Sequence, residues 1–194
     1  MKTNKINNNT NFGWRYYTHK KITGKLVDEF PKLKESKDLL VKMVARPDFD
    51  ERGFQGNNHF YYPPQLFRPR ESFFDFFGRN NALASYTGHL FKFKKNLELD
   101  EKKALSEAGR ALHFLQDITQ PNHVERGNIL EKWRDLSMHK RFENYVYANE
   151  DQFIANAQPP ELDVPKGDFL DLFEEAVFLS ECTPKPKTTN NNVW

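Results

Sequence analysis

The segment 100–118 constrains the fold of this chain more than any other stretch, because its apolar side chains recur at helical spacing. Asp100 stands where a helix N-cap is expected, and Pro121 follows closely enough to end the helix. The apolar face is formed by Ala104, Ala108, Leu112 and Leu115. Such a helix is stable only when other elements cover this face, so the sequence predicts helices packed side by side.

Other helices are expected on both sides of this segment. Apolar spacing and prolines predict them at about 16–29, 33–46, 137–155 and 168–181, and another from about residue 70 through FFDFFGRNNALASYTGHLFKF. A long loop, about 47–70, is rich in proline, glycine, asparagine and aromatic residues. No segment shows a convincing strand-like alternation of polar and apolar residues, so we predict an all-α fold, a multi-helix bundle with long loops.

The domain organisation predicted from composition is one helical domain, 14–182, between two polar tails. The tails, 1–13 and 183–194, are rich in asparagine, threonine and lysine, which predicts loosely attached segments. The 18 Phe of the chain must supply much of the core of this domain.

Charge and cysteine content limit the classes of function. With 29 basic and 27 acidic residues the net charge is +2, without the basic excess that is usual in duplex-binding proteins. Cys182 is the only cysteine, so any metal must be held by histidine and carboxylate side chains. We recognise neither a signal peptide at the start of the chain nor a stretch of ~20 apolar residues that could cross a membrane.

Two pairs of one histidine and one carboxylate have the spacing that brings ligands to one face of a helix. His113 and Asp117 are four residues apart, and His139 and Glu143 repeat the spacing. His123 lies between the pairs, just after a proline turn. One such pair alone is more often a surface ion pair, but two pairs around a histidine turn favour a metal site. Zinc suits this set, because it binds imidazole nitrogen and carboxylate oxygen.

Further candidate ligands stand upstream, and each has an ordinary structural explanation when taken alone. Trp14 and His19 lie in GWRYYTH, where the tryptophan could be a core residue. Asp48 lies in PDFDE and could cap a turn, and His59 lies in GNNHFYYP and could bond to the loop backbone.

Taken in order, these motifs resemble the superfamily of zinc-dependent phospholipases C and single-strand-specific nucleases. The resemblance covers about residues 14–155 and is sharpest at HFLQDITQPNH and HKRFENYV. It implies a cluster of two to three zinc ions at the end of the helical bundle. It also implies hydrolysis of a phosphodiester by a metal-activated water.

The resemblance further implies how the ligands are divided among the ions. The implied ligands of one zinc are His59, His113 and Asp117, and those of a second are His123, His139 and Glu143. His89 has no part in this scheme and is interpreted as structural or exposed.

The third zinc of the family would be held by Trp14 and His19, with Asp117 bridging it to the first. In the family this tryptophan is the mature N-terminus and binds through its amine and carbonyl, whereas thirteen residues precede Trp14 here. The resemblance therefore implies either cleavage after Gly13 or a different third site. Asp48 would lie beside the cluster as a ligand or as the general base.

These residues are compatible with three functions. The first is a phospholipase C, which cleaves phospholipid head groups and makes peripheral contact with a membrane. The second is a nuclease acting on single-stranded nucleic acid, and the third is a catalytically inactive metal-binding helical domain. The five-residue separation of Trp14 and His19 is similar to that in the nuclease branch of the superfamily. The glutamate at position 143 is similar to that in the phospholipase branch. The family implies a secreted or periplasmic location, and we predict no obligate protein partner.

Overall fold

The structure is a computed structural model that describes residues 16–51, 58–61, 81–120, 122–124, 129–156 and 169–182. Within the helices, the side chains of 129–139, 156, 169–170 and 181–182 are not described. Trp14 and the two predicted tails lie outside the described residues. The described part is all-α, as predicted, and its only pairing of extended residues is an isolated bridge between Tyr61 and Val124.

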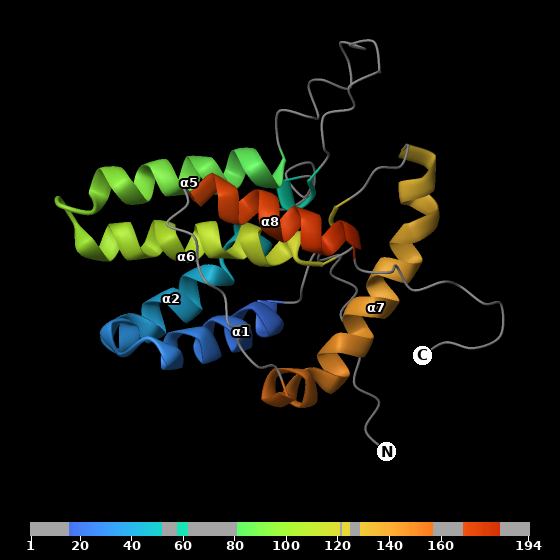
Figure 1. Cartoon of the computed structure of the whole chain (residues 1–194), viewed down its shortest axis with the longest axis horizontal. Helices are drawn as coiled ribbons and strands as arrows, with labels where there is room; N and C mark the ends of the chain where they lie inside the picture. Colours follow the sequence, from blue (N-terminus) through green and yellow to red (C-terminus); the bar gives the residue numbers. More distant parts are fainter. Residues whose placement is uncertain are drawn as a thin grey trace, which may run out of the picture.

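The helix predicted from the strongest apolar pattern is α6, Glu101–Ile118. Asp100 caps it as expected, because its side chain accepts a hydrogen bond from the backbone N–H of Lys103. Helix α6 packs against α5, Ala82–Asn96, and against α2, Lys37–Val44. The three helices lie in successive layers, with α6 between the other two (Figure 1).

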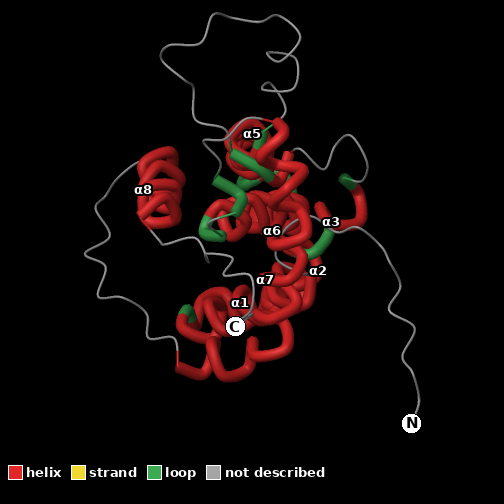
Figure 2. Tube along the Cα trace, turned by 90° about the vertical axis from the view of Figure 1, so that its right-hand side faces the viewer, coloured by secondary structure: helices red, strands yellow, loops and turns green. Residues whose placement is uncertain are grey.

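The remaining helices surround this centre. Helix α1, Tyr16–Glu29, packs against α2 and also against α7, Ile129–Asn156. Helix α8, Phe169–Cys182, packs on α6 and lies to one side of the α5–α6 pair in Figure 2. None of the described helices combines the length and the apolarity needed to cross a membrane.

The apolar core joins α5, α6 and α8 on one side of α6. Its buried members are Ala82, Tyr86, Ala111, Phe114, Ile118, Val124 and Phe173. Burial of this much aromatic and aliphatic surface is the main favourable term in folding. It fixes α6 at the centre of the molecule.

The opposite face of α6 meets α2 at very short range, and Gly109 permits this approach. A Cβ atom at Gly109 would lie 2.8 Å from Cβ of Met43 and 3.2 Å from the carbonyl oxygen of Leu40. Real Cβ atoms essentially never come as close as 2.8 Å to another heavy atom, so a larger residue would push the two helices apart.

Several predicted boundaries are wrong. The helix expected at 33–46 is divided into a 3₁₀ helix, Pro31–Ser36, and α2, because Pro31 fits the first turn of a helix. For the same reason a short helix α3, Pro47–Asp50, opens the segment predicted as a loop. The helix expected at 137–155 already starts at residue 129, since neither glycine nor proline interrupts the residues between.

The helix expected from about residue 70 also differs. Helix α5 begins at Ala82, after Asn81, whose extended backbone and side-chain bond to the N–H of Ala84 form an N-cap. Asparagine bonds to nearby backbone groups in this way, which is why it starts helices more readily than it continues them. The predicted residues before Asn81 lie outside the described part.

Candidate metal centre

The end of α6 gathers most of the predicted site residues whose side chains are described. They come from α1, α3, the segment 58–61, α6 and the turn after it: His19, Asp48, His59, His113, Asp117 and His123. All of these residues are buried, and none is more than 4% exposed. Residues far apart in the sequence therefore meet in one interior space.

Asp117 lies at the centre of this group. Its Oδ2 lies 2.7 Å from Nδ1 of His59 and 3.1 Å from Nε2 of His113, and its Oδ1 lies 3.2 Å from Nε2 of His19. The ring nitrogens of His59 and His113 are 2.9 Å apart. Ligand atoms that share one tetrahedral ion, with bonds of about 2.0–2.2 Å, stand about 3.3–3.6 Å apart. The separations of 3.1 and 3.2 Å are near this range, whereas those of 2.7 and 2.9 Å are hydrogen-bond distances.

Several atoms of the group are buried without a hydrogen-bond partner among the described residues. They are Nε2 of His19, Oδ1 of Asp117 and both carboxylate oxygens of Asp48. His19 and Asp117 lie 3.2 Å apart, but without the geometry of a hydrogen bond, so both atoms face a common space. Leaving a polar atom in this state costs about 1–3 kcal/mol, and a cation would satisfy all of these atoms together.

The histidine rings are oriented by bonds from their other nitrogens. Nδ1 of His113 donates to the carbonyl oxygen of Val44 at 2.7 Å, and Nδ1 of His123 donates to the carbonyl oxygen of His59 at 2.7 Å. Each bond places the proton on Nδ1, so that Nε2 of the same ring carries the electron pair and acts as an acceptor or a ligand. Histidines that bind metals are usually held by bonds of this kind.

The ring of His19 is oriented by a side chain, that of Gln116, instead of a backbone carbonyl. Its Nδ1 donates to Oε1 of Gln116 at 2.8 Å, and Nε2 of Gln116 donates to the hydroxyl of Thr23 at 2.9 Å. The second bond fixes the amide so that its oxygen faces the ring. The electron pair on Nε2 of His19 then points toward Asp117.

The charges of the group are strongly coupled. Burial alone would raise the pKa of Asp117, but the histidines around it, His113 foremost, hold that pKa well below its usual range. Burial lowers the pKa of His113 to about 3, so its ring is neutral. Burial also opposes protonation of His19 and His59, yet the carboxylate of Asp117 outweighs it and raises both pKa values.

Asp48 differs from Asp117 in its protonation. Burial, as the largest cause, raises the pKa of Asp48 to about 7. Its Oδ1 lies 3.9 Å from Nε2 of His113, so it stands at the edge of the cluster. A carboxyl group that titrates near neutral pH can accept or release a proton there.

The residues predicted for a second ion are described only in part. Glu143 of α7 is buried, and Nε2 of Gln120 lies 3.5 Å from its Oε1. His123 is turned with Nδ1 3.9 Å from Oδ1 of Asp117. His139 lies in α7, but its side chain is outside the described part, as is all of Trp14. His89 stands apart from the cluster and bonds to Glu107 at 2.6 Å.

Two groups of three residues, which share His113, could hold a metal ion. His19, His113 and Asp117 form one set, and Asp48, His59 and His113 form the other, each with ligand atoms within 4.8 Å of one another. The buried His and Asp side chains could therefore hold a metal ion.

The residues that orient the ligands were not predicted from the sequence. Gln116 carried a signal, since it follows Leu112 by four residues and therefore interrupts the apolar face of α6. Gln120, fully buried two residues after the end of α6, follows Gln116 by four residues. The contribution of Val44 is a backbone carbonyl, which no side-chain pattern reveals.

No protein-family model, no curated protein and no solved structure matches this chain.

Proposed function

We propose that this chain is a zinc-dependent phosphodiester hydrolase of phospholipase C type, which cleaves phospholipid head groups. The observation that carries the proposal is the meeting of His19, His59 and His113 with Asp48 and Asp117 in one buried space. Burying three histidines and two carboxylates costs free energy, because each charged group among them loses its hydration. A divalent ion would compensate this loss.

Zinc is the proposed ion because the donors are imidazole nitrogen and carboxylate oxygen, and cysteine is absent from the group. His59, His113 and Asp117 would hold one zinc. The proposed ligands of a second zinc are His123, His139 and Glu143, and those of a third are His19 and Trp14, with Asp117 shared.

Zinc bound there would lower the pKa of water and offset the charge of a phosphodiester. Asp48 is the proposed general base. Both of its oxygens are buried without a partner among the described residues, and in the protein without a metal burial raises its pKa to about 7. Asp117 stays ionised beside it, so the two carboxylates have different roles.

A row of aromatic rings, most of them from residues near His19 and Asp48 in the sequence, supports two classes of substrate. Tyr17 contacts Tyr147 and Tyr16, with ring centroids 5.9 Å and 3.8 Å apart, and Tyr16 contacts Phe49 at 5.2 Å. Tyr17 and Phe49 are 45% and 40% exposed, so their faces can meet a substrate. Such rings hold the cationic head group of a choline lipid by cation–π contact.

The same row favours a second candidate function, cleavage of single-stranded nucleic acid. Aromatic faces stack on bases without regard to sequence, and this contributes about 1–3 kcal/mol per base. Lys20, whose Nζ lies 5.6 Å from the centroid of the Tyr16 ring, adds positive charge for a phosphate backbone.

The first experiment counts zinc in the purified protein and compares two variants. We expect two to three ions per chain in the wild type, loss of the metal and of all hydrolysis in His113→Ala, and no loss in His89→Ala, whose histidine lies outside the cluster. A His113→Ala variant with wild-type zinc content and activity would refute the proposal.

The second experiment tests a phosphatidylcholine analogue in vesicles and single-stranded DNA side by side. Cleavage of the lipid supports a phospholipase C that contacts membranes peripherally. Cleavage of DNA alone supports the nuclease instead. Zinc without either activity would leave a metal-binding helical domain and reject the hydrolase.

A further inference from the structure

The long helix α7 is joined to the rest of the molecule in an unusual way. Of the residues 140–155, whose side chains are described, only Glu143 and Glu150 are buried. They are seven residues apart, which places them on one face of the helix, about 10 Å apart along its axis. The two buried side chains of this segment of α7 are therefore acidic, and the apolar Val146 and Ile154 on the same face are only partly buried, whereas a helix that packs on a core is normally apolar there.

Glu150 is held by two side chains of α1. The hydroxyl of Thr18 donates to its Oε2 at 2.9 Å, and Nζ of Lys21 lies 2.5 Å from its Oε1. Each oxygen of the carboxylate thus has its own donor, which fixes the group in both position and orientation. Hydrogen bonds to an ionised acceptor are about twice as strong as neutral ones.

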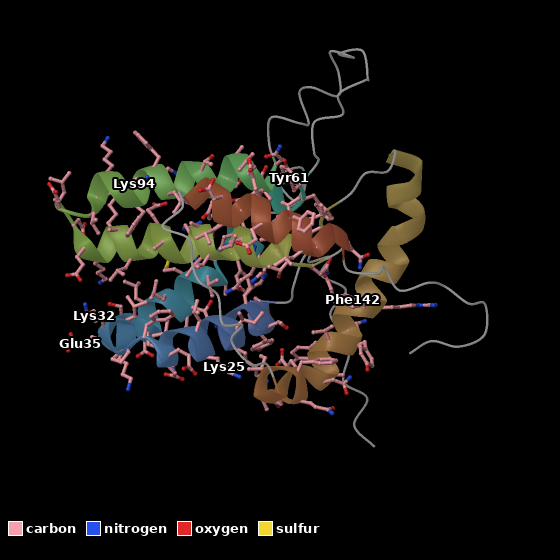
Figure 3. The ribbon with its side chains drawn as sticks, viewed as in Figure 1. Lys25, Lys32, Glu35, Tyr61, Lys94 and Phe142 are labelled. Carbon is pink, nitrogen blue, oxygen red and sulfur yellow. The ribbon has the colours of Figure 1, made fainter. Side chains whose placement is uncertain are left out.

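Other contacts follow in step along the two helices. Tyr17 meets Tyr147 one turn before Glu150, and Lys25 donates to the carbonyl oxygen of Ile154 one turn after it. Figure 3 shows Lys25 of α1 beside the end of α7, with Phe142 farther along the same helix. The register of α7 along α1 is therefore set by polar contacts around Glu150.

We propose that Glu150, bound by Thr18 and Lys21, is a positioning residue that sets the register of α7 and so places Glu143 at the metal centre. Glu143 lies two turns away on the same face, near Gln120. The inference rests on the proposed metal centre, in which Glu143 and His139 are ligands of the second zinc. It assigns a specific task to an ion pair that is otherwise a simple contact between helices.

A positioning role and a purely structural role predict different metal binding. If Glu150 only stabilises the fold, its loss affects every zinc to the same degree. If it positions α7, its loss weakens the zinc that needs Glu143. The zinc held by His59, His113 and Asp117 does not use α7, so its affinity should not change.

The test measures stepwise zinc affinities of the full chain by competition with a chromophoric chelator. In Glu150→Ala we expect one step to weaken about 10–100-fold, the usual effect of removing a group that orients ligands, and another to stay unchanged. Glu150→Gln keeps the shape and can still accept a bond from Thr18, so it should weaken the same step less. If Glu150→Ala does not fold, Glu150→Gln alone tests the inference.

Asp151→Asn is the matched control. Asp151 also pairs with Lys21, at 2.7 Å, but its side chain is 91% exposed and does not touch the buried side of α7. We expect every step to stay as in the wild type. Equal weakening of all steps by both Glu150 variants, or no weakening, would overturn the inference. Absence of zinc binding in the wild type would instead overturn the proposed function.

Discussion

Replacing Gly109 by alanine tests how the packing of two helices serves the metal centre. The new Cβ would lie 2.8 Å from Cβ of Met43, and ordinary contacts are 3.4–4 Å. A Cβ atom cannot rotate away, and the next neighbours are backbone atoms of Leu40 and Val44. Helix α2 must therefore move by about 1 Å to restore normal contact distances.

Two opposing effects decide the change in stability. Overpacking costs about 1–3 kcal/mol, while alanine in place of glycine in a helix gains about 1 kcal/mol. Gly88→Ala in α5 isolates the second effect, because its new Cβ would meet nothing within 4 Å. Gly109→Ala should thus be less stable than Gly88→Ala by about 1–3 kcal/mol, or roughly 2–12 °C in Tm.

The same movement should reach the metal centre. The carbonyl oxygen of Val44 accepts the bond that orients His113, at 2.7 Å. A shift of about 1 Å takes this bond beyond hydrogen-bonding range, and zinc affinity should fall about 10–100-fold. Thermal unfolding and chelator competition measure the two effects. If Gly109→Ala matched Gly88→Ala in both, the close approach of α2 would have no part in orienting His113.

Three further predictions concern the centre directly. Zinc at about one hundred times its Kd should stabilise the protein by about 2.7 kcal/mol, seen by calorimetry as a higher Tm than in chelator. Gln116→Met removes the acceptor for His19 and should weaken zinc about 10–100-fold, and unchanged affinity in a chelator titration would contradict this role. In the metal-free protein the pKa of Asp48 is raised from 3.8 to about 7, so the folded state binds this proton more tightly than the unfolded state. The contribution of Asp48 to stability therefore declines as pH rises through this range. In Asp48→Asn the free energy of unfolding should fall less steeply with pH, by up to about 1.4 kcal/mol per pH unit. The same slope as in the wild type, measured by urea unfolding at a series of pH values, would refute this role of Asp48.

The parts of the fold that were predicted correctly depend on local patterns. Helix α6 follows from its apolar period and the cap at Asp100, and α1 from the proline after it, because both signals lie within one element. The pair His113 and Asp117 is local for the same reason. The start of α5 at Ala82 was missed because the Phe-rich sequence before Asn81 suggested one continuous helix.

The rest of the site depends on contacts between distant residues. His19 and Gln116 are separated by 97 positions, and His123 and His59 by 64. Spacing cannot show that such residues meet, since their contact depends on how α1, α2 and the segment 58–61 pack around α6. The resemblance suggested the ligands, but the bonds that orient their rings are visible only in three dimensions.

Helix α6 connects the fold to the proposed chemistry, because it is buried on two faces of opposite character. One face carries Phe114 and Ile118 into the apolar core. The other carries Gly109, His113 and Asp117 at four-residue intervals, first as a close contact with α2 and then as candidate ligands. The apolar face supplies free energy of burial, and the polar face loses hydration that packing cannot replace. A cation would therefore stabilise the fold most at the last turns of α6. There Asp117 is surrounded by histidines from three other segments.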